Sequence, residues 1–157
     1  MARAGVELRR ESLESPPACR LIAELNAELT ERYPEAGATH FALDASEVAA
    51  GHGAFLVALI DGDAVGCGAV RRIEDGVAEV KRMYVRPAAR GRGTGGAILA
   101  ALEREARSLG ARRLVLETGV RQPEALALYR RFGFAVIPPF GEYVDSPLSV
   151  CMAKDLG

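Results

Sequence analysis

A run of glycine and arginine at residues 90–96 carries the clearest chemical signal in the sequence. It reads Arg-Gly-Arg-Gly-Thr-Gly-Gly, which places four of the chain's 17 glycines in seven positions, ahead of a long amphipathic stretch. Glycine lets backbone N–H groups approach a ligand closely, and the start of a helix favours negative charge. Arg90 and Arg92 add donors suited to phosphate oxygens. The run therefore predicts a site for a phosphate-bearing ligand, with a flexible glycine-rich turn as the structural alternative.

Two known phosphate-binding patterns fit this loop poorly. A Walker loop requires GxxxxGK[ST], which the sequence lacks. Gly91, Gly93 and Gly96 do spell the GxGxxG of dinucleotide-binding sheets, and Glu117 follows at about the 20-residue spacing of that fingerprint. The fingerprint follows its strand almost directly, however, whereas residues 86–90 intervene here. A dinucleotide site is therefore a weak match.

Composition excludes several other classes of protein. The 157 residues are 49% hydrophobic and 26% charged with a net charge of -1, which indicates one folded domain without the basic surplus of nucleic-acid binders. Three cysteines without CxxC spacing indicate free thiols in a reducing, cytoplasmic compartment. No signal peptide and no apolar run of membrane-spanning length is apparent. His40 and His52 form no HExxH motif, so no metal site is expected.

Hydrophobic patterns in the first half predict two helices and four strands. Leu21, Leu25 and Leu29 share one face of the first helix. Asp-Gly pairs at 61–62 and 75–76 separate three short apolar runs, and such pairs favour tight hairpin turns. We therefore expect an antiparallel meander in the middle of the chain. The expected elements are a strand at 6–9, helices at 18–32 and 44–50, and strands at 54–60, 64–71 and 77–85.

The second half alternates helix and strand. Ile98, Leu99 and Leu102 share one face of a long helix that ends at Gly110. The order strand, helix, strand predicts a right-handed parallel crossover at the end of the meander. Together the two halves predict one mixed α/β domain over residues 1–157. The expected elements are a helix at 93–109, a strand at 113–117, a helix at 123–132, and strands at 134–137 and 148–153.

Residues 80–95 resemble motif A of the GNAT superfamily, the acyl-CoA-dependent N-acetyltransferases. The family pattern Gln/Arg-x-x-Gly-x-Gly/Ala is matched by Arg90, Gly93 and Gly95. Residues 122–134 are similar to a second family signature, Asn-x-x-Ala followed by Leu-Tyr and Gly-Phe. The resemblance implies an α/β fold of three layers, in which helices flank a central twisted sheet that is mixed but mostly antiparallel. It also implies an enzyme that uses acetyl-CoA.

The resemblance implies a set of cofactor contacts. In the family, a β-bulge splays the strand before the glycine loop, and the backbone of that strand pairs with the pantetheine amides. The pyrophosphate lies on backbone N–H groups of the loop, from Arg90 onward. Gln122 occupies the position where the family commonly has an asparagine. The cofactor-binding residues so implied are Met83, Tyr84, Val85, Arg90, Gly91, Arg92, Gly93, Thr94, Gly95 and Gln122.

Tyr129 matches the tyrosine that the family often uses as a general acid toward the departing CoA thiolate. A phenol can donate a proton to a developing thiolate. The rest of its helical face is apolar, so packing in the core is the alternative role.

Glu79 is the first candidate for the general base. It lies eleven residues before Arg90, where some family members carry a catalytic glutamate. A carboxylate can take the proton of an attacking amine directly or through water. The structural alternative is a solvated residue paired with Lys81. Glu117 on the adjacent strand and ordered water are the other candidates for the base.

The acceptor is expected to be a primary amine on a small molecule that attacks acetyl-CoA directly, because no cysteine has an evident histidine partner. Arg71 and Arg82 are candidates to bind an acceptor carboxylate, which would indicate an amino-acid-like amine. The other candidates for the acceptor groove are Tyr33, His40, Phe41, Glu142 and Tyr143.

A catalytically inactive module that binds CoA or acetyl-CoA as a sensor is the alternative function. Nucleic-acid and membrane partners are not expected, whereas exposed edge strands are compatible with a homodimer.

Overall fold

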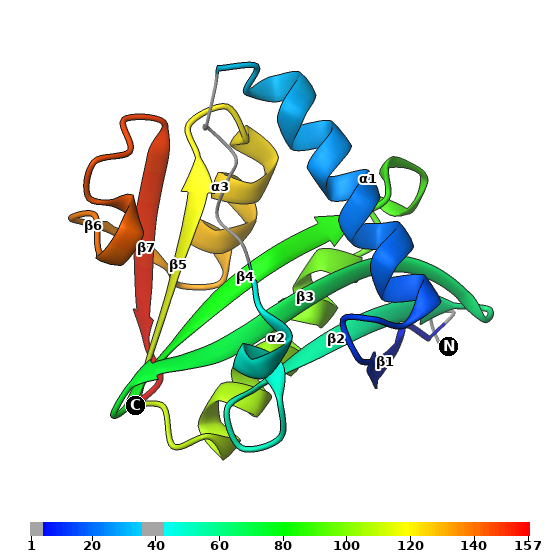
Figure 1. Ribbon diagram of the computed structural model, residues 1–157, viewed down its shortest axis with the longest axis horizontal. Helices are drawn as coiled ribbons and strands as arrows, with labels where there is room; N and C mark the ends of the chain where they lie inside the picture. The colour runs from blue at the N-terminus through cyan, green and yellow to red at the C-terminus, as the bar shows by residue number, and fades with distance from the viewer. Residues whose placement is uncertain (1–4, 36–42) are drawn as a thin grey trace.

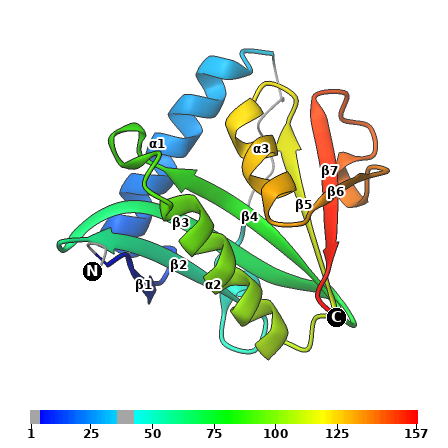
Figure 2. The ribbon, with the colours of Figure 1, turned by 180° about the vertical axis from the view of Figure 1, so that it is seen from behind.

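A seven-stranded sheet forms the centre of the computed structural model, which describes residues 5–35 and 43–157. The strand order is β1-β2-β3-β4-β5-β7-β6, and β4 and β5 are the parallel pair among antiparallel neighbours. Helix α1 covers one face of the sheet, and α2 and α3 cover the other (Figures 1 and 2). The expected three-layer, mixed α/β fold with a mostly antiparallel sheet is therefore confirmed.

The strands are β1 (Glu7–Arg10), β2 (Gly53–Ile60), β3 (Asp63–Glu74), β4 (Val77–Val85), β5 (Arg113–Gly119), β6 (Ala135–Ile137) and β7 (Ser149–Asp155). The helices are α1 (Pro16–Arg32), α2 (Thr94–Ser108) and α3 (Pro123–Arg131), with short 3-10 turns η1 (Ala45–Val48), η2 (Pro87–Ala89) and η3 (Gly141–Tyr143).

The start of α1 and the segment at 44–50 differ from expectation. α1 begins two residues early, because its two prolines occupy the first turn, where no helical N–H is lost, and Ser15 Oγ accepts the Ala18 N–H at 3.2 Å. The helix expected at 44–50 is only the 3-10 turn η1. Its start is fixed by Glu47, whose carboxylate accepts the Asp44 N–H at 2.9 Å.

Both expected hairpins are present, and each uses its Asp-Gly pair. Asp61 and Gly62 have φ of 51° and 84° at the β2–β3 turn, and Gly76 has φ of 76° at the β3–β4 turn. Positive φ is what a two-residue hairpin turn requires and what glycine and aspartate tolerate. The crossover from β4 through α2 to β5 then makes the expected parallel pair.

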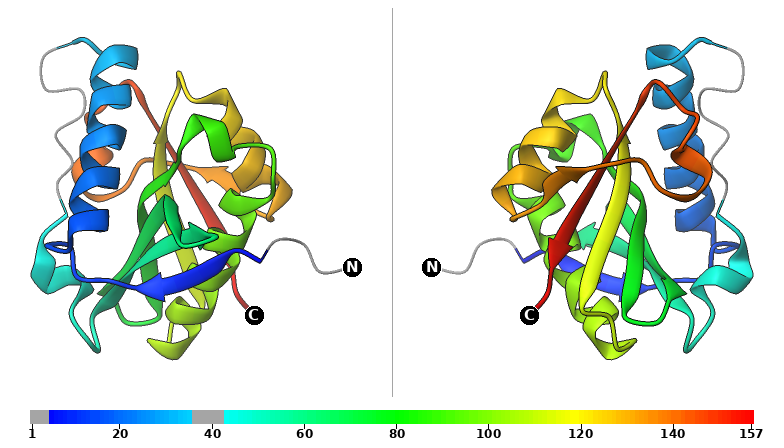
Figure 3. Two further views of the ribbon diagram at one scale, coloured as in Figure 1. Left: turned by 90° about the vertical axis from the view of Figure 1, so that its right-hand side faces the viewer. Right: turned by 90° about the vertical axis from the view of Figure 1, so that its left-hand side faces the viewer.

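Each face of the sheet has its own hydrophobic cluster, between the strands and the helices that Figure 3 shows on either side of them. Leu21 and Leu25 of α1 pack with Phe55 and other residues of the meander on one face. On the opposite face, Ile98 and Leu102 of α2 pack in a larger cluster that extends to α3 and the end of the chain. A one-residue shift in strand pairing would move each side chain to the opposite face of the sheet. Because both faces are buried, packing fixes which side chains of each strand point toward α1.

A β-bulge at Arg82 changes which face of the sheet the following side chains of β4 point to. Cys67 and Ala69 of β3 are two residues apart, but their partners Tyr84 and Lys81 are three apart, so β4 carries one extra residue. Arg82 is that residue and has a left-handed φ of 57°. A bulge of this kind bends its strand and increases its twist.

Beyond the bulge, β4 and β5 separate. Their ladder ends at the pair Val80–Leu116, although β4 continues to Val85 and β5 to Gly119. The two strands diverge as a V in Figure 1. The bulged, splayed strand that the resemblance implies is therefore present.

Candidate active site

A groove of about 900 Å³ runs along the glycine loop. Its walls are the end of β4, α1, the first turn of α2, and α3 along its length. The volume lies near the top of the range of about 300–1,000 Å³ for small-molecule sites, as a long ligand requires. All of the expected cofactor-binding residues line it except Arg92, which is exposed on the loop. Those that line it are Met83, Tyr84, Val85, Arg90, Gly91, Gly93, Thr94, Gly95 and Gln122.

The glycine loop leads directly into α2. Gly93 is the residue before the helix and has a left-handed φ of 79°, which a residue with a side chain rarely adopts. The first N–H groups of a helix have no carbonyl partner within it and attract anions. Arg90 is an exception to the expected cradle, because its N–H already donates to the Pro87 carbonyl at 3.2 Å. Backbone donors for a phosphate therefore begin after Arg90.

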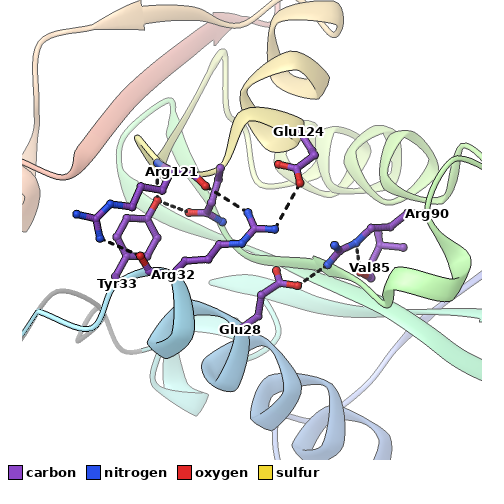
Figure 4. A network of polar contacts seen from close by, with 8 residues as sticks. Glu28, Arg32, Tyr33, Val85, Arg90, Arg121 and Glu124 are labelled. Atoms are coloured by element: carbon purple, nitrogen blue, oxygen red, sulfur yellow. Dashed lines mark hydrogen bonds and ion pairs between the residues drawn. The ribbon is translucent and has the colours of Figure 1, made fainter.

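The Arg90 side chain is held at both ends of its guanidinium (Figure 4). Its Nε donates to the Val85 carbonyl at 2.8 Å, and Nη2 donates to Glu28 of α1 at 2.8 Å. A second ion pair joins Arg32 of α1 to Glu124 of α3 at 3.4 Å. Glu28, Arg32 and Glu124 all line the groove, so α1 is tied by ion pairs to both of its other walls. These contacts depend on side chains far apart in the sequence and were not predicted.

A second cavity, of about 100 Å³, lies between the diverging ends of β4 and β5. Residues from α1, β7 and η3 complete its walls. The groove and this cavity share lining residues, so they adjoin. The shared residues are Leu25, Met83, Gln122 and Tyr129.

Tyr129 projects from α3 to this junction. It is buried, it packs edge-on against Phe134 with ring centroids 5.9 Å apart, and it lines both spaces. Burial, and secondly the charge of Glu117, raise the pKa of its phenol, which therefore stays protonated. Both roles weighed for Tyr129 are thus compatible with its position, since a packed side chain also reaches the junction.

Glu117 lines the small cavity from β5. Its Oε2 accepts a hydrogen bond of 2.6 Å from the Ser149 hydroxyl. Burial is the main cause that raises its pKa, with the charges of Glu79 and Glu142 adding to the effect and the Ser149 hydrogen bond and Lys81 opposing it. A carboxyl with a raised pKa is a stronger base than an ordinary glutamate.

Glu79 has a different environment. It is fully buried, and its two oxygens are occupied, one by Arg71 Nε at 2.9 Å and the other by the Tyr143 hydroxyl at 2.7 Å. It does not line the small cavity, whereas Glu117 does. The alternative of a solvated Glu79 is wrong, because the register places its side chain beneath η3 and against Arg71.

The residues expected at the acceptor end separate into three groups. Tyr33, Arg82 and Tyr143 line the small cavity. Arg71 is instead held by Glu47 and Glu79, and Glu142 lies 3.6 Å from Lys81. His40 and Phe41 lie outside the described residues. Sequence reasoning did not assign Lys81 or Ser149 to the cavity, since the bulge and the β5–β7 register that place them there involve distant strands.

Metal ligands and membrane spans can be assessed over the same part of the chain. In residues 5–35 and 43–157, no three His, Cys, Asp or Glu side chains are grouped so as to hold a metal ion. No helix within those ranges is both long and apolar enough to cross a bilayer. Cys19, Cys67 and Cys151 are all free thiols.

Comparison with known families identifies the fold. The model of the Acetyltransferase (GNAT) family matches residues 18–134. The chain belongs to the GNAT family. It is 45% identical to the IAA acetyltransferase of Azospirillum brasilense, over 97% of this chain and 99% of that protein. GNAT membership makes it an acyltransferase and confirms the resemblance seen in the glycine loop and in α3.

Solved structures of GNAT proteins agree with this placement. A candidate acyl-CoA N-acyltransferase from Klebsiella pneumoniae superimposes with a TM-score of 0.83 at 35% identity, over 99% of this chain and 100% of that one. A GNAT acetyltransferase from Elizabethkingia anophelis with acetyl-CoA bound has a TM-score of 0.70 at 16% identity, over 98% and 100% of the two chains. The second likeness shows the shared fold, which in that protein holds acetyl-CoA.

Proposed function

We propose that this GNAT protein transfers the acetyl group of acetyl-CoA to the primary amine of a small molecule. The observation that carries the proposal is the junction at Tyr129, where a groove of cofactor size meets a small cavity that contains a carboxylate. The 45% identity to an acetyltransferase named for IAA supports a small-molecule acceptor.

The groove fits CoA in its donors and its shape. The backbone N–H groups after Arg90 and the start of α2 suit a pyrophosphate, and the side chains of Arg90 and Arg131 line the same groove. The end of β4 at Met83 to Val85 pairs with β3 but not with β5, so its β5 side offers backbone groups to the amides of pantetheine. Acetyl-CoA supplies an acyl thioester, the group that an amine attacks.

Glu117 and Tyr129 are the residues that we propose move protons. A C–N bond forms between the amine and the acetyl carbon as the C–S bond breaks. Glu117 takes the proton that the amine loses, and Tyr129 gives its phenolic proton to the sulfur. Glu117 is preferred to Glu79 because its carboxylate lines the cavity, whereas Glu79 is enclosed by Arg71 and Tyr143.

A free-thiol assay over a panel of amines tests the proposal. We expect CoA release that depends on an amine, a fall of about 10²–10⁴ in kcat for Tyr129→Phe and for Glu117→Gln, and an unchanged dissociation constant for acetyl-CoA. Glu31→Gln, on the exposed side of α1, is the matched control. Stabilisation by CoA and acetyl-CoA without thiol release for any amine would favour the sensor. Stabilisation by NAD(H) but not CoA would favour the dinucleotide site.

A homodimer stays a prediction. β1 and β6 are the two edges of the sheet, and Val136 on β6 is exposed. Sedimentation of the purified protein would measure its oligomeric state.

A further inference from the structure

The small cavity between β4 and β5 is lined by three charged side chains, Lys81, Arg82 and Glu117. The Lys81 side chain is only 5% exposed, and its ammonium lies 3.6 Å from Glu142. Arg82 is partly buried, and its Nη1 donates to Asn26 of α1 at 3.0 Å. The charged lining thus contains two cations and one carboxylate. Both signs of charge are therefore present, as a molecule that carries an amine and a carboxylate requires.

The two signs of charge lie on opposite walls of the cavity. The last pair of the β4–β5 ladder is Val80 with Leu116. Lys81 and Glu117 are the next residues along each strand, at the point where the two strands separate. Both point toward the α1 face, because Lys81 pairs with Ala69 of the α1-side cluster and Leu116 belongs to the opposite cluster. The cavity therefore has a cationic β4 wall and an anionic β5 wall.

The bulge that brings Arg82 to the cavity is conformationally demanding. Arg82 has a φ of 57°, a region that a long L side chain rarely adopts. The Cys67 thiol contacts the Arg82 carbonyl at 3.3 Å from β3 and helps to hold this conformation. Backbone strain of this kind is concentrated at functional sites. Its effect here is that β4 presents two successive cations, Lys81 and Arg82, to one space.

The size of the cavity limits what can enter. A cavity of about 150 Å³ accommodates benzene, and this one has about 100 Å³. It therefore admits a small acceptor, on the scale of an amine, one carbon and a carboxylate. Leu25, Leu29 and Leu148 supply the apolar part of the lining, which suits a small or apolar substituent on that carbon.

From these observations we infer that the acceptor is a small α-amino acid, whose amine lies at Glu117 and whose carboxylate lies at Arg82 and Lys81. The inference rests on the proposed acetyl transfer. The amino acid gains the acetyl group through a new C–N bond and CoA leaves as the thiol, so the products are an N-acetyl amino acid and CoA. Arg82 is then the residue that selects acceptors with a free carboxylate.

Paired substrates test this directly. Glycine, alanine, valine and leucine would each be compared with the corresponding amide, in which the carboxylate is replaced by a neutral group of the same shape. We expect kcat/KM to be at least 100-fold higher for the acids. In Arg82→Asn, chosen because asparagine tolerates a left-handed φ, and in Lys81→Met, the acid-to-amide ratio should fall at least tenfold. Arg72→Gln removes an exposed arginine of β3 and should keep the wild-type ratio.

The outcomes distinguish this inference from the proposed function. Equal use of acids and amides, or acetylation of putrescine and kanamycin but of no amino acid, would overturn the amino-acid acceptor and leave N-acetyl transfer standing. Failure of every amine, with acetyl-CoA still bound, would overturn the transfer itself. Acetyl-CoA titration and thermal unfolding of each variant show whether it is folded. If both cavity variants unfold, the wild-type comparison of acids with amides alone decides.

Discussion

The Tyr143 hydroxyl donates a hydrogen bond of 2.7 Å to Glu79 Oε2. This contact joins η3, the turn before the last strand, to the first half of β4. Tyr143 lines the acceptor cavity, and Glu79 does not. Glu79, the first candidate for the base in the sequence, therefore anchors a wall of the cavity, with Arg71 on its other oxygen.

Tyr143→Phe tests that anchoring. It removes the donor to a buried carboxylate, and a hydrogen bond to a charged group contributes about 1.5–3 kcal/mol. We expect the free energy of unfolding in urea to fall by about 2 kcal/mol. The same variant should raise KM for the amine more than KM for acetyl-CoA. An unchanged unfolding free energy, with Glu79→Gln also neutral, would show that the contact is dispensable.

The pH dependence of kcat/KM for the amine distinguishes the two candidate bases. Glu117 has a raised pKa, chiefly because it is buried, and the groups facing it are Glu79 and Lys81 of β4, Glu142 of η3 and Ser149 of β7. A base acts when it is deprotonated, so activity should fall as pH drops through that raised pKa, above the range of an ordinary glutamate. The amine must also be deprotonated to attack, so its own titration causes a second fall in kcat/KM as pH drops.

Substitutions separate these two falls in kcat/KM. In Glu117→Gln, the fall in kcat/KM that comes from protonation of the carboxylate should disappear, and the fall that comes from protonation of the amine should remain. Glu79→Gln should keep both falls and instead unfold more easily. A wild-type profile in Glu117→Gln, together with the loss of one of the two falls in Glu79→Gln, would return the role of base to Glu79.

The glycine loop shows how far the sequence predicts this molecule. Its glycines, the arginines beside them and the helix that follows are adjacent in the chain, so local spacing predicted the loop, α2 and the ligand class. The same holds for the Asp-Gly hairpins. The three-layer fold with a mostly antiparallel sheet was implied by two motifs of one family, and the strand pairing in the structure confirms it.

The acceptor end could not be predicted in this way. Which of Glu79 and Glu117 reaches the cavity depends on η3 and on the β4–β5 ladder, which involve residues distant in sequence. Alternation alone would place Arg82 on the opposite face from Lys81, and only the extra residue in β4 brings both to the cavity. Long-range register, rather than local propensity, decided those positions.

Glu28 is expected to weaken cofactor binding. Its carboxylate lines the cofactor groove and holds Arg90 Nη2 at 2.8 Å, so a bound phosphate meets a negative charge and an arginine that is already paired. Glu28→Gln should lower KM for acetyl-CoA by two- to fivefold, which corresponds to about 0.4–1 kcal/mol and is ordinary for a partly exposed ion pair. Glu31→Gln removes the same charge one turn away and should leave KM unchanged. A higher KM in Glu28→Gln would mean that the pair positions Arg90 productively.

Gly119 sets the shape of the junction between groove and cavity. A Cβ on this residue would collide with the Tyr33 hydroxyl and lie 2.7 Å from Gln122 Oε1. Tyr33 would have to move, and its hydroxyl would lose the Arg121 N–H that it accepts at 2.8 Å. Because Tyr33 lines the acceptor cavity, Gly119→Ala should raise KM for the amine at least tenfold in steady-state assays.

In a Tyr33→Ala background most of the collision is absent, so the added effect of Gly119→Ala should be much smaller there. Full additivity of the two substitutions would show that Gly119 acts through another neighbour.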